Sequence, residues 1–374
     1  DGFRRTLPLG TVTIQETKPP TGYLINNELF IRQITSQGTA ESVRTYNQPI
    51  VPDQVIRGGV AIEKWDFDLN RRAAPQGDAT LAGSVLEIYN RSANSVVVNG
   101  QTYMPGAVVH TMTTDEAGGA ATANDLLPYG EYEIIEKTPP TGYLNTGVIR
   151  QSFAIRDQGI IVSLKTSATT IKNNVIRGGV EIEKWDIERD ERVLKQGDAT
   201  LEGAVLEIWN RSTHSVVVEG TEYAPGAVVH TLTTDADGWA GTESNLLPCG
   251  SYEIIEKTPP TGYLNTGIIR QSFQIREESV IVNLKASETV IKNNIIRGGV
   301  LVEKWDNEID AHRPQGGATL EGAIFEIVNR SADSVLVQDV LYGVGEVVYT
   351  FETDSTGTAQ TPSELLPYGT YEVR

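Results

Sequence analysis

Three lysines recur in this chain at positions where a β-strand should direct its side chains into an apolar core. The strand-like segments that carry them are VAIEKWD at 60–66, VEIEKWD at 180–186 and VLVEKWD at 300–306. Successive side chains of a strand point to opposite faces, so Val60, Ile62 and Lys64 share one face. The same parity puts Lys184 and Lys304 on apolar faces. Because lysine is rarely buried alone, each strand predicts a polar partner.

A glutamate shares the core-facing side of a second strand, the one that precedes the motif PPTGY. Glu136 has the same parity as Tyr132 and Ile134, and Glu256 and Glu16 occupy the equivalent places in the neighbouring copies. A carboxylate is therefore predicted to face the core beside each lysine.

An asparagine points inward from the last strand of each copy. The doublets Asn173-Asn174 and Asn293-Asn294 leave two choices open. The first copy has a single asparagine, Asn47, in TYNQPI, and it aligns with the first member of each doublet. This alignment favours Asn173 and Asn293.

A lysine, a glutamate and an asparagine buried together can form an isopeptide crosslink. Desolvation disfavours both charged forms, so it lowers the pKa of the lysine and raises that of the glutamate. The neutral amine can then attack the carboxamide, while a protonated glutamate hydrogen-bonds its oxygen and shuttles the proton that lets ammonia leave. The alternative is an ordinary buried ion pair of the lysine with its glutamate, or with Asp66 or Asp186, which contributes little once desolvation is counted.

Composition excludes several other kinds of chemistry. The formal charge of -18 on 374 residues argues against nucleic acid and anionic membranes as partners. One cysteine, Cys249, allows no intrachain disulfide, and four scattered histidines give no zinc-like cluster, so we predict no metal. We find no apolar run long enough to insert in a membrane, and no nucleophile or cofactor motif of a turnover enzyme. We therefore predict a non-enzyme without cofactors.

The chain is a tandem array with a period of 120 residues, the spacing of Lys64, Lys184 and Lys304. The segment IRGG marks each joint between copies. The predicted domains are 1–56, the back half of a repeat; 57–176 and 177–296, two complete repeats; and 297–374, the front half of a repeat. Such short joints predict repeats stacked end to end as a semi-rigid rod.

Each repeat consists of short β-branched and aromatic runs separated by turn residues, which predicts an all-β sandwich of seven or eight strands. Candidate strands are 60–66, 84–90, 95–98, 107–113, 131–136, 148–156, 160–164 and 169–173. The tryptophans Trp65, Trp185 and Trp305 fall on the outward face of the first strand. We expect this face to pack against a neighbouring domain rather than to bind glycans.

The order KxD, then ExxxPxGY, then a terminal-strand asparagine resembles the Cna B-type, or SpaA-like, repeats of Gram-positive surface adhesins and pilins. The resemblance covers essentially the whole chain and implies tandem prealbumin-like, inverse immunoglobulin-like β-sandwiches. The bonds that it implies are Lys64 to Asn173 with Glu136 as catalyst, and Lys184 to Asn293 with Glu256 as catalyst. The KxD aspartates Asp66, Asp186 and Asp306 are supporting residues. Pro139 and Pro259 depart from the alanine that the family often has, and LPLG, LPYG and LPCG are not sortase signals.

Three inward polar groups in the family's order favour the crosslink over the ion pair. We therefore predict a structural stalk or spacer on the outside of a Gram-positive cell, whose partners are further copies of the repeat in a longer chain or in neighbouring molecules. The alternatives are an adhesive module for an unidentified host ligand and a head-to-tail filament. Glu16, Asn47 and Lys304 lack their counterparts within the chain, and in the filament Lys304 of one molecule joins Asn47 of the next. The plainer interpretation of both ends is a fragment of a longer array.

Overall fold

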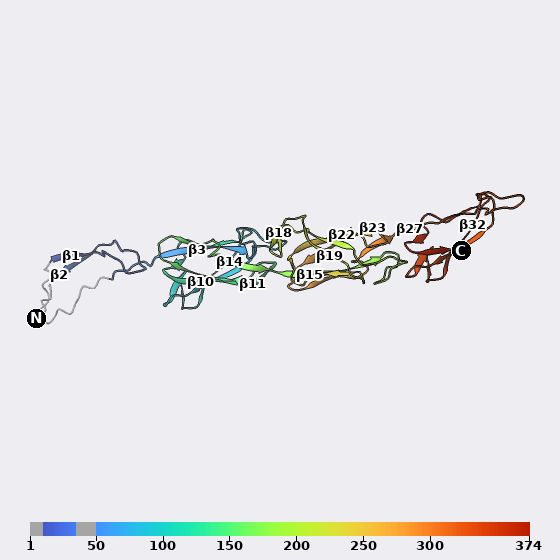
Figure 1. The fold of residues 1–374 in the computed structure, drawn as a ribbon. Helices are drawn as coiled ribbons and strands as arrows, with labels where there is room; N and C mark the ends of the chain where they lie inside the picture. The colour runs from blue at the N-terminus through green and yellow to red at the C-terminus, as the bar shows by residue number, and fades with distance from the viewer. Residues whose placement is uncertain (1–9, 35–49) are drawn as a thin grey trace. The chain divides into compact units, whose positions relative to one another are not determined.

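The computed structural model describes residues 10–34 and 50–374, and every regular element in them is a β-strand (Figure 1). The chain divides into two compact units. The first comprises Asp1–Ala74 and Thr80–Asn174, and the second comprises Pro75–Ala79 and Val175–Arg374. The predicted domain boundaries at 56, 176 and 296 stay predictions.

Two sheets form the sandwich of the first unit. One is four-stranded in the order β12-β10-β4-β7, and the other runs β11-β14-β3-β13, with two short strands, β8 and β9, also paired to β3. Their bounds are β3 Arg57–Asp66, β4 Val85–Asn90, β7 Val108–Thr113, β8 Gly119–Ala121, β9 Leu127–Pro128, β10 Gly130–Thr138, β11 Tyr143–Val148, β12 Arg150–Ile155, β13 Ile161–Leu164 and β14 Ile171–Val175. Two hairpins complete this part, β5 Val96–Val98 with β6 Gln101–Tyr103, and β1 Gly10–Ile14 with β2 Phe30–Ile34.

The second unit repeats this topology between residues 177 and 295. Its sheets run β19-β16-β22-β24 and β20-β15-β26-β23, with β21 and β25 paired to β15. The bounds are β15 Arg177–Asp186, β16 Val205–Asn210, β17 Val216–Val218, β18 Thr221–Tyr223, β19 Val228–Thr233, β20 Trp239–Gly241, β21 Leu247–Pro248, β22 Gly250–Thr258, β23 Tyr263–Ile268, β24 Arg270–Ile275, β25 Ile281–Leu284 and β26 Ile291–Ile295.

The rest of the second unit has smaller sheets. They are β27-β34, β28-β33, β30-β31 and the three-stranded β32-β29-β35. The bounds are β27 Arg297–Gly298, β28 Leu301–Glu303, β29 Ile324–Asn329, β30 Val335–Val337, β31 Val340–Tyr342, β32 Val347–Glu352, β33 Thr358–Gln360, β34 Leu366–Pro367 and β35 Tyr371–Val373.

The two sheets of the first unit enclose one apolar core. Inward side chains of β3, β4 and β10, such as Ile62, Leu86 and Ile134, are at most 1% exposed. The rings of Tyr132 and Phe153 stack with centroids 5.5 Å apart. The period-two pattern of the sequence therefore positions the core as predicted, because each β-strand buries alternate residues.

The second face of the first strand is also covered, which contradicts the expected exposure of its tryptophans. Trp65 and Trp185 are only 9% and 8% exposed. The indole N–H of Trp65 donates to Glu63, whose carboxylate also pairs with Arg72 at 2.9 Å. The ammonium of Lys172 on β14 lies 6.0 Å from the Trp65 ring centroid. The tryptophans of the two complete repeats are therefore too buried to bind glycans.

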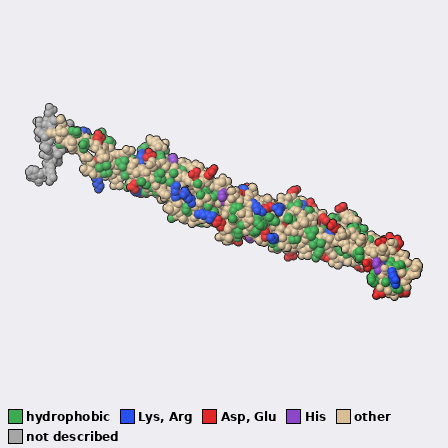
Figure 2. Space-filling view, turned by 90° about the horizontal axis from the view of Figure 1, so that it is seen from above, with side chains coloured by type: hydrophobic (Ala, Val, Ile, Leu, Met, Phe, Trp, Pro, Cys, Tyr) green, Lys and Arg blue, Asp and Glu red, His purple; other side chains and the backbone are tan. Residues whose placement is uncertain are grey.

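The surface carries charges of both signs. Figure 2 shows acidic and basic side chains intermixed over the visible face, in a chain with 49 acidic and 31 basic residues. Among the described residues, no helix has the length and apolar character needed to cross a bilayer.

Candidate isopeptide site

Three strands from two sheets bring the predicted residues of the first complete repeat together. Lys64 lies near the end of β3, which pairs in parallel with β14, so that Lys64 is opposite Ile171 and Asn173 is opposite Asp66. Glu136 comes from β10 in the facing sheet. Lys64, Glu136 and Asn173 are 1%, 2% and 0% exposed. The first and last strands of the repeat thus meet at a carboxylate inside the sandwich.

One carboxylate contacts both prospective reactants. The Nζ of Lys64 is 3.6 Å from Oε1 of Glu136, and the Nδ2 of Asn173 donates to Oε2 of Glu136 at 2.6 Å. Asn173 Nδ2 also donates to the carbonyl of Thr146 at 3.3 Å. The two amide hydrogens are therefore held, which fixes the plane of the carboxamide.

The atoms that would react are buried without hydrogen bonds. Neither Lys64 Nζ nor the carboxamide oxygen of Asn173 has a hydrogen-bond partner in the described part of the chain, although Lys64 is ion-paired with Glu136. Native proteins pair most buried polar groups, and an unpaired one costs about 1–3 kcal/mol. The amine of Lys64 and the carboxamide of Asn173 thus lie beside the same carboxylate, each with a polar atom that makes no hydrogen bond.

Burial prepares the lysines chemically. Desolvation lowers the pKa of Lys64 and of Lys184 to about 8, although the neighbouring carboxylates act in the opposite direction. At pH 7 such a lysine is neutral in roughly one molecule in ten, compared with about 3 in 10,000 at a pKa of 10.5. Burial therefore raises the fraction of neutral amine at pH 7.

The second complete repeat has a similar arrangement, with differences at the lysine and at the glutamate. Asn293 Nδ2 donates to Glu256 Oε2 at 2.6 Å, and Lys184 Nζ donates to the carbonyl of Trp185 at 3.0 Å. Glu256 Oε1 is buried without a hydrogen bond, because Ala204 stands where the first repeat has a serine. Desolvation raises the pKa of Glu256, so its protonated form, the proposed proton donor, becomes more populated.

The structure distinguishes the two asparagines of each doublet. Asn174 and Asn294 are half-buried and donate to the hydroxyls of threonines, each at 3.0 Å. Asn173 and Asn293 are the members that contact the glutamates. The crosslink itself stays a prediction.

Residues that the sequence did not single out complete the site. Ser84 donates its hydroxyl to Glu136 Oε1 at 2.6 Å. It has the parity of Leu86 and Ile88, so extending the strand pattern by one step would have found it. The hydroxyl of Tyr143, from the PPTGY motif, donates to Asp66 at 2.9 Å.

The KxD aspartates hold the turn after the lysine strand. Asp66 Oδ1 accepts the amide N–H of Leu69 at 2.8 Å, and Asp186 Oδ1 accepts that of Glu188 at 2.8 Å. Asp306 Oδ1 likewise accepts the amide N–H of Glu308 at 2.9 Å. These contacts give the three aspartates a structural role in the turn that follows each lysine strand.

The residues predicted to lack counterparts lie in different surroundings. The Lys304 side chain is exposed to solvent, whereas Lys64 and Lys184 are buried. Glu16 is half-buried and accepts the amide N–H of Asn26 at 2.7 Å. Asn47 lies outside the described residues. In residues 10–34 and 50–374, no three His, Cys, Asp or Glu residues gather where they could hold a metal ion.

A model of the SpaA prealbumin-like fold domain family matches residues 73–170 and 180–289, together more than half of the chain. The chain therefore belongs to this family, and the predicted tandem prealbumin-like sandwiches are confirmed. No curated protein sequence matches the chain.

Several solved structures are similar to this one. The Bacillus anthracis TIE protein has a TM-score of 0.47 and 20% sequence identity, over 94% of this chain and 48% of that protein. The present chain thus spans about half the length of the TIE protein. GBS52, the minor pilin of Streptococcus agalactiae, has a TM-score of 0.25 and 18% identity, over 64% of this chain and 96% of that one. The shaft pilin SpaA from Lactobacillus rhamnosus GG has a TM-score of 0.24 and 16% identity, over 64% and 98%.

Proposed function

We propose that this chain is a structural segment of a Gram-positive surface protein whose complete repeats are each locked by a Lys–Asn isopeptide bond. One observation carries the proposal. In the first complete repeat a single buried carboxylate contacts both a lysine of the first strand and an asparagine of the last strand, and in the second the equivalent carboxylate contacts the equivalent asparagine. Membership of the SpaA prealbumin-like family supports the same function.

The bond forms by exchange of one amine for another at the asparagine side chain. The neutral Nζ of Lys64 attacks Cγ of Asn173, and the carboxamide oxygen takes up the negative charge of the tetrahedral intermediate. Glu136 supplies a proton to the departing Nδ2 and receives one from Nζ, so it ends the reaction unchanged. The C–Nζ bond replaces the C–Nδ2 bond, and one molecule of ammonia leaves. Lys184, Glu256 and Asn293 have the same roles in the second repeat.

The position of the bond determines its mechanical effect. The bond joins β3, where the chain enters the repeat, to β14, where it leaves. About 110 residues lie between Lys64 and Asn173, which correspond to roughly 360–400 Å of extended chain. Tension applied to the two ends passes through the covalent bond, so this length cannot be pulled out. Such a repeat suits a stalk that must resist force and proteolysis.

The surroundings of such a stalk follow from the family. The resemblance to repeats of surface adhesins and pilins supports an extracellular location on a Gram-positive cell. The partners we propose are further copies of the repeat, in the same chain or in neighbouring molecules. The unfavourable electrostatics of a chain with a net charge of -18 argue against nucleic acid.

Pulling single molecules by their ends tests this function. We expect that neither complete repeat releases an extension of roughly 360–400 Å, since the crosslink closes that length of chain. The matched control is a chain with Asn173→Ala and Asn293→Ala, in which two such extensions should appear. Long extensions from the unmodified protein would contradict the proposal.

A further inference from the structure

The glutamates of the two complete repeats differ in one neighbouring hydroxyl group. Ser84 precedes β4 of the first repeat, and Ala204 and Ala323 occupy its place in the two later copies. Ser84 is 0% exposed, and its hydroxyl donates to Glu136 Oε1 at 2.6 Å. The same oxygen lies 3.6 Å from Lys64 Nζ. The serine thus binds the carboxylate oxygen that is ion-paired with the lysine.

The backbone at this position has the same partners in both repeats. The amide N–H of Ser84 donates to Thr114 Oγ1 at 3.0 Å, and its carbonyl accepts the amide N–H of Thr114 at 3.0 Å. Ala204 makes the equivalent bonds with Thr234, at 2.9 Å and 3.0 Å. An exchange of serine and alanine here therefore adds or removes a hydroxyl group while the backbone bonds stay the same.

The glutamate and the lysine have other surroundings where the hydroxyl is absent. Within the described residues, Glu256 Oε1 is buried and makes no hydrogen bond. Lys184 Nζ donates to the carbonyl of Trp185 at 3.0 Å. Asn293 donates to Glu256 Oε2 at 2.6 Å, as its counterpart does in the first repeat. The two sites thus differ at Oε1 of the glutamate and at the lysine, while the contact with the asparagine is the same.

The titratable side chains around the two glutamates are of the same kinds, so they do not account for the difference. Each repeat has the lysine and the KxD aspartate of its first strand, and a tyrosine whose hydroxyl donates to that aspartate at 2.9 Å. These residues are Lys64, Asp66 and Tyr143 in the first repeat, and Lys184, Asp186 and Tyr263 in the second.

The hydroxyl influences which protonation state of the glutamate is stable. A hydrogen bond donated to a carboxylate stabilises the charged form, whereas burial without a donor favours the protonated acid. Burial raises the pKa of Glu256. The crosslinking reaction needs a neutral lysine beside a protonated glutamate, so the ion pair of Lys64 and Glu136 must first pass a proton from the amine to the carboxylate. The hydrogen bond from Ser84 stabilises the ion pair and makes this transfer less favourable.

We propose that Ser84 is a positioning residue that slows isopeptide bond formation in the first complete repeat by holding Glu136 as a carboxylate. The inference rests on the proposed crosslink and adds a control of its rate. The balance of the reaction is unchanged, since Lys64 Nζ replaces Nδ2 of Asn173 and one molecule of ammonia leaves. The residue before β4, serine or alanine, therefore tunes how fast a repeat becomes locked.

The rate of crosslinking in newly made protein tests the proposal. The full chain is synthesised in a short cell-free translation pulse, and samples are quenched in acid at intervals. Proteolysis and mass spectrometry then give the fraction of each lysine that has joined its asparagine. We expect Ser84→Ala to speed the first bond about tenfold and Ala204→Ser to slow the second about tenfold, the effect of one hydrogen bond to a charged group.

The pH dependence of these rates separates a role at the glutamate from a purely structural one. Below the pKa of the glutamate both groups carry protons, so the lysine is an ammonium and the rate falls. Because a donated hydrogen bond lowers the pKa of a carboxyl group, Ser84→Ala should move this acid limb of the rate profile to higher pH. Ala204→Ser should move the acid limb of the second repeat to lower pH.

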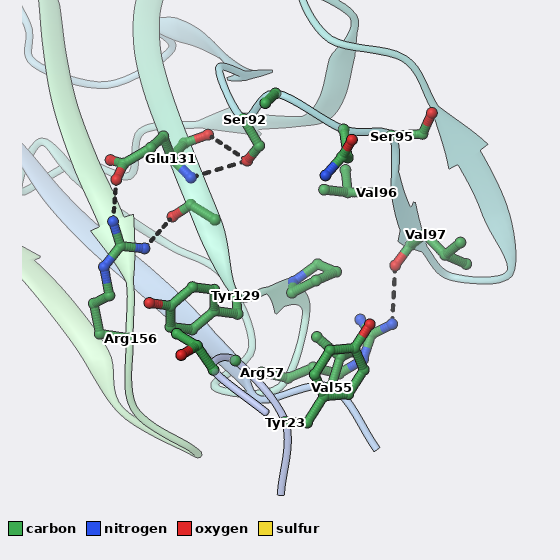
Figure 3. A pocket seen from close by; sticks show the side chains of 16 residues that line it. Tyr23, Val55, Arg57, Ser92, Ser95, Val96, Val97, Tyr129, Glu131 and Arg156 are labelled. Atoms are coloured by element: carbon green, nitrogen blue, oxygen red, sulfur yellow. Dashed lines mark hydrogen bonds and ion pairs between the residues drawn. The ribbon is translucent and has the colours of Figure 1, made fainter. Parts of the chain in front are cut away.

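Ser92→Ala is the matched control in the first repeat. The hydroxyl of Ser92 donates to the carbonyl of Glu131 at 3.3 Å and accepts its amide N–H at 2.9 Å, as Figure 3 shows. Removing it takes away hydrogen bonds of the backbone but none of Glu136. We expect Ser92→Ala to leave both the rate of the first bond and its acid limb unchanged.

The outcomes distinguish a failure of this inference from a failure of the crosslink. Bonds that form in both repeats at rates and with acid limbs that do not respond to the exchange of serine and alanine would overturn the role of Ser84 alone. An equal effect of Ser92→Ala and Ser84→Ala would do the same. If no chain forms a crosslink in either repeat, the proposed function is contradicted, and this inference with it.

Discussion

Lys64 and Lys304 occupy the same sequence motif, EKWD, but lie in opposite environments. Lys64 is 1% exposed inside a sandwich, whereas Lys304 is exposed to solvent. The difference extends to their neighbours, since Trp65 is 9% exposed and Trp305 is 51% exposed. The local sequence therefore does not by itself bury the lysine.

The difference comes from the strands that flank the motif. β3 pairs with β13 and β14 as well as β8 and β9, whereas β28 pairs with β33. The strands β13 and β14 belong to the back half of the first complete repeat, and β14 also supplies Asn173. Burial, the lowered pKa and the electrophile thus arrive together, when the back half of the repeat covers the front half.

The largest expected effect is on the free energy of unfolding, when a buried lysine and the exposed Lys304 are each replaced by methionine. Lys184→Met keeps a long side chain in the core but removes the nucleophile. It should lower the free energy of unfolding of its repeat by about 4–5 kcal/mol, the entropic value of closing a loop of roughly 110 residues. Lys304→Met, at an exposed site, should change it by less than about 0.5 kcal/mol. Urea denaturation measures both, and equal effects would remove the distinction between the two lysines.

The stability of a chain that cannot form the crosslinks should depend on pH, because its buried lysines would titrate as free amines. In a chain with Asn173→Ala and Asn293→Ala, each buried lysine titrates near 8 when folded and near 10.5 when unfolded. Between these values the unfolded state binds more protons, so the free energy of unfolding should rise with pH, by up to about 3 kcal/mol per lysine. Below pH 8 the folded state carries the full cost of a buried ammonium.

The unmodified protein is the control for that titration, because the proposed crosslinks would make its two lysines amides, which do not titrate. The difference in urea midpoint between the two chains should narrow as the pH rises from 8 to 10.5. A constant difference across this range would show that the lysines are not buried as free amines in the variant.

Removing Ser84, which is present in the first complete site and absent from the second, should lower stability by a smaller amount. Ser84→Ala makes the first site resemble the second and leaves a buried oxygen of Glu136 without its donor, at a cost of about 1–3 kcal/mol. The reverse change, Ala204→Ser, should stabilise the second repeat by roughly 0.5–1.5 kcal/mol. Thermal unfolding of both variants provides the measurement, and a neutral Ser84→Ala would argue against a structural role for this hydrogen bond.

Strand periodicity was sufficient to predict the sandwich and the residues at its centre. The parity of Lys64, Glu136 and Asn173 placed them on core-facing sides of three strands. In the structure the carboxylate of Glu136 contacts the side chains of the other two. β11 was missed because its sequence, YLNTGV, does not alternate and contains Gly147, whose φ is 104°. Such a conformation interrupts the pattern that identifies a strand.

The covered face of Trp65 was not predictable from alternation alone. Some central strands are covered by other side chains on both faces. When the second face of such a strand carries polar residues, its sequence alternates in the same way as that of a strand with one face in water. Here Glu63 is buried because Arg72 and the indole of Trp65 satisfy its carboxylate. The strand's own alternation does not show that its second face is covered by side chains such as Arg72 and Lys172.

The intact mass of the denatured chain tests the central claim most directly. Each isopeptide bond removes one molecule of ammonia, so the chain should be lighter than its sequence by two molecules of ammonia. Lys304→Met should retain both losses relative to its own sequence, whereas Lys64→Met should retain one. Peptide mapping should then find Lys64 joined to Asn173 and Lys184 joined to Asn293. A mass equal to that of the sequence would contradict the account.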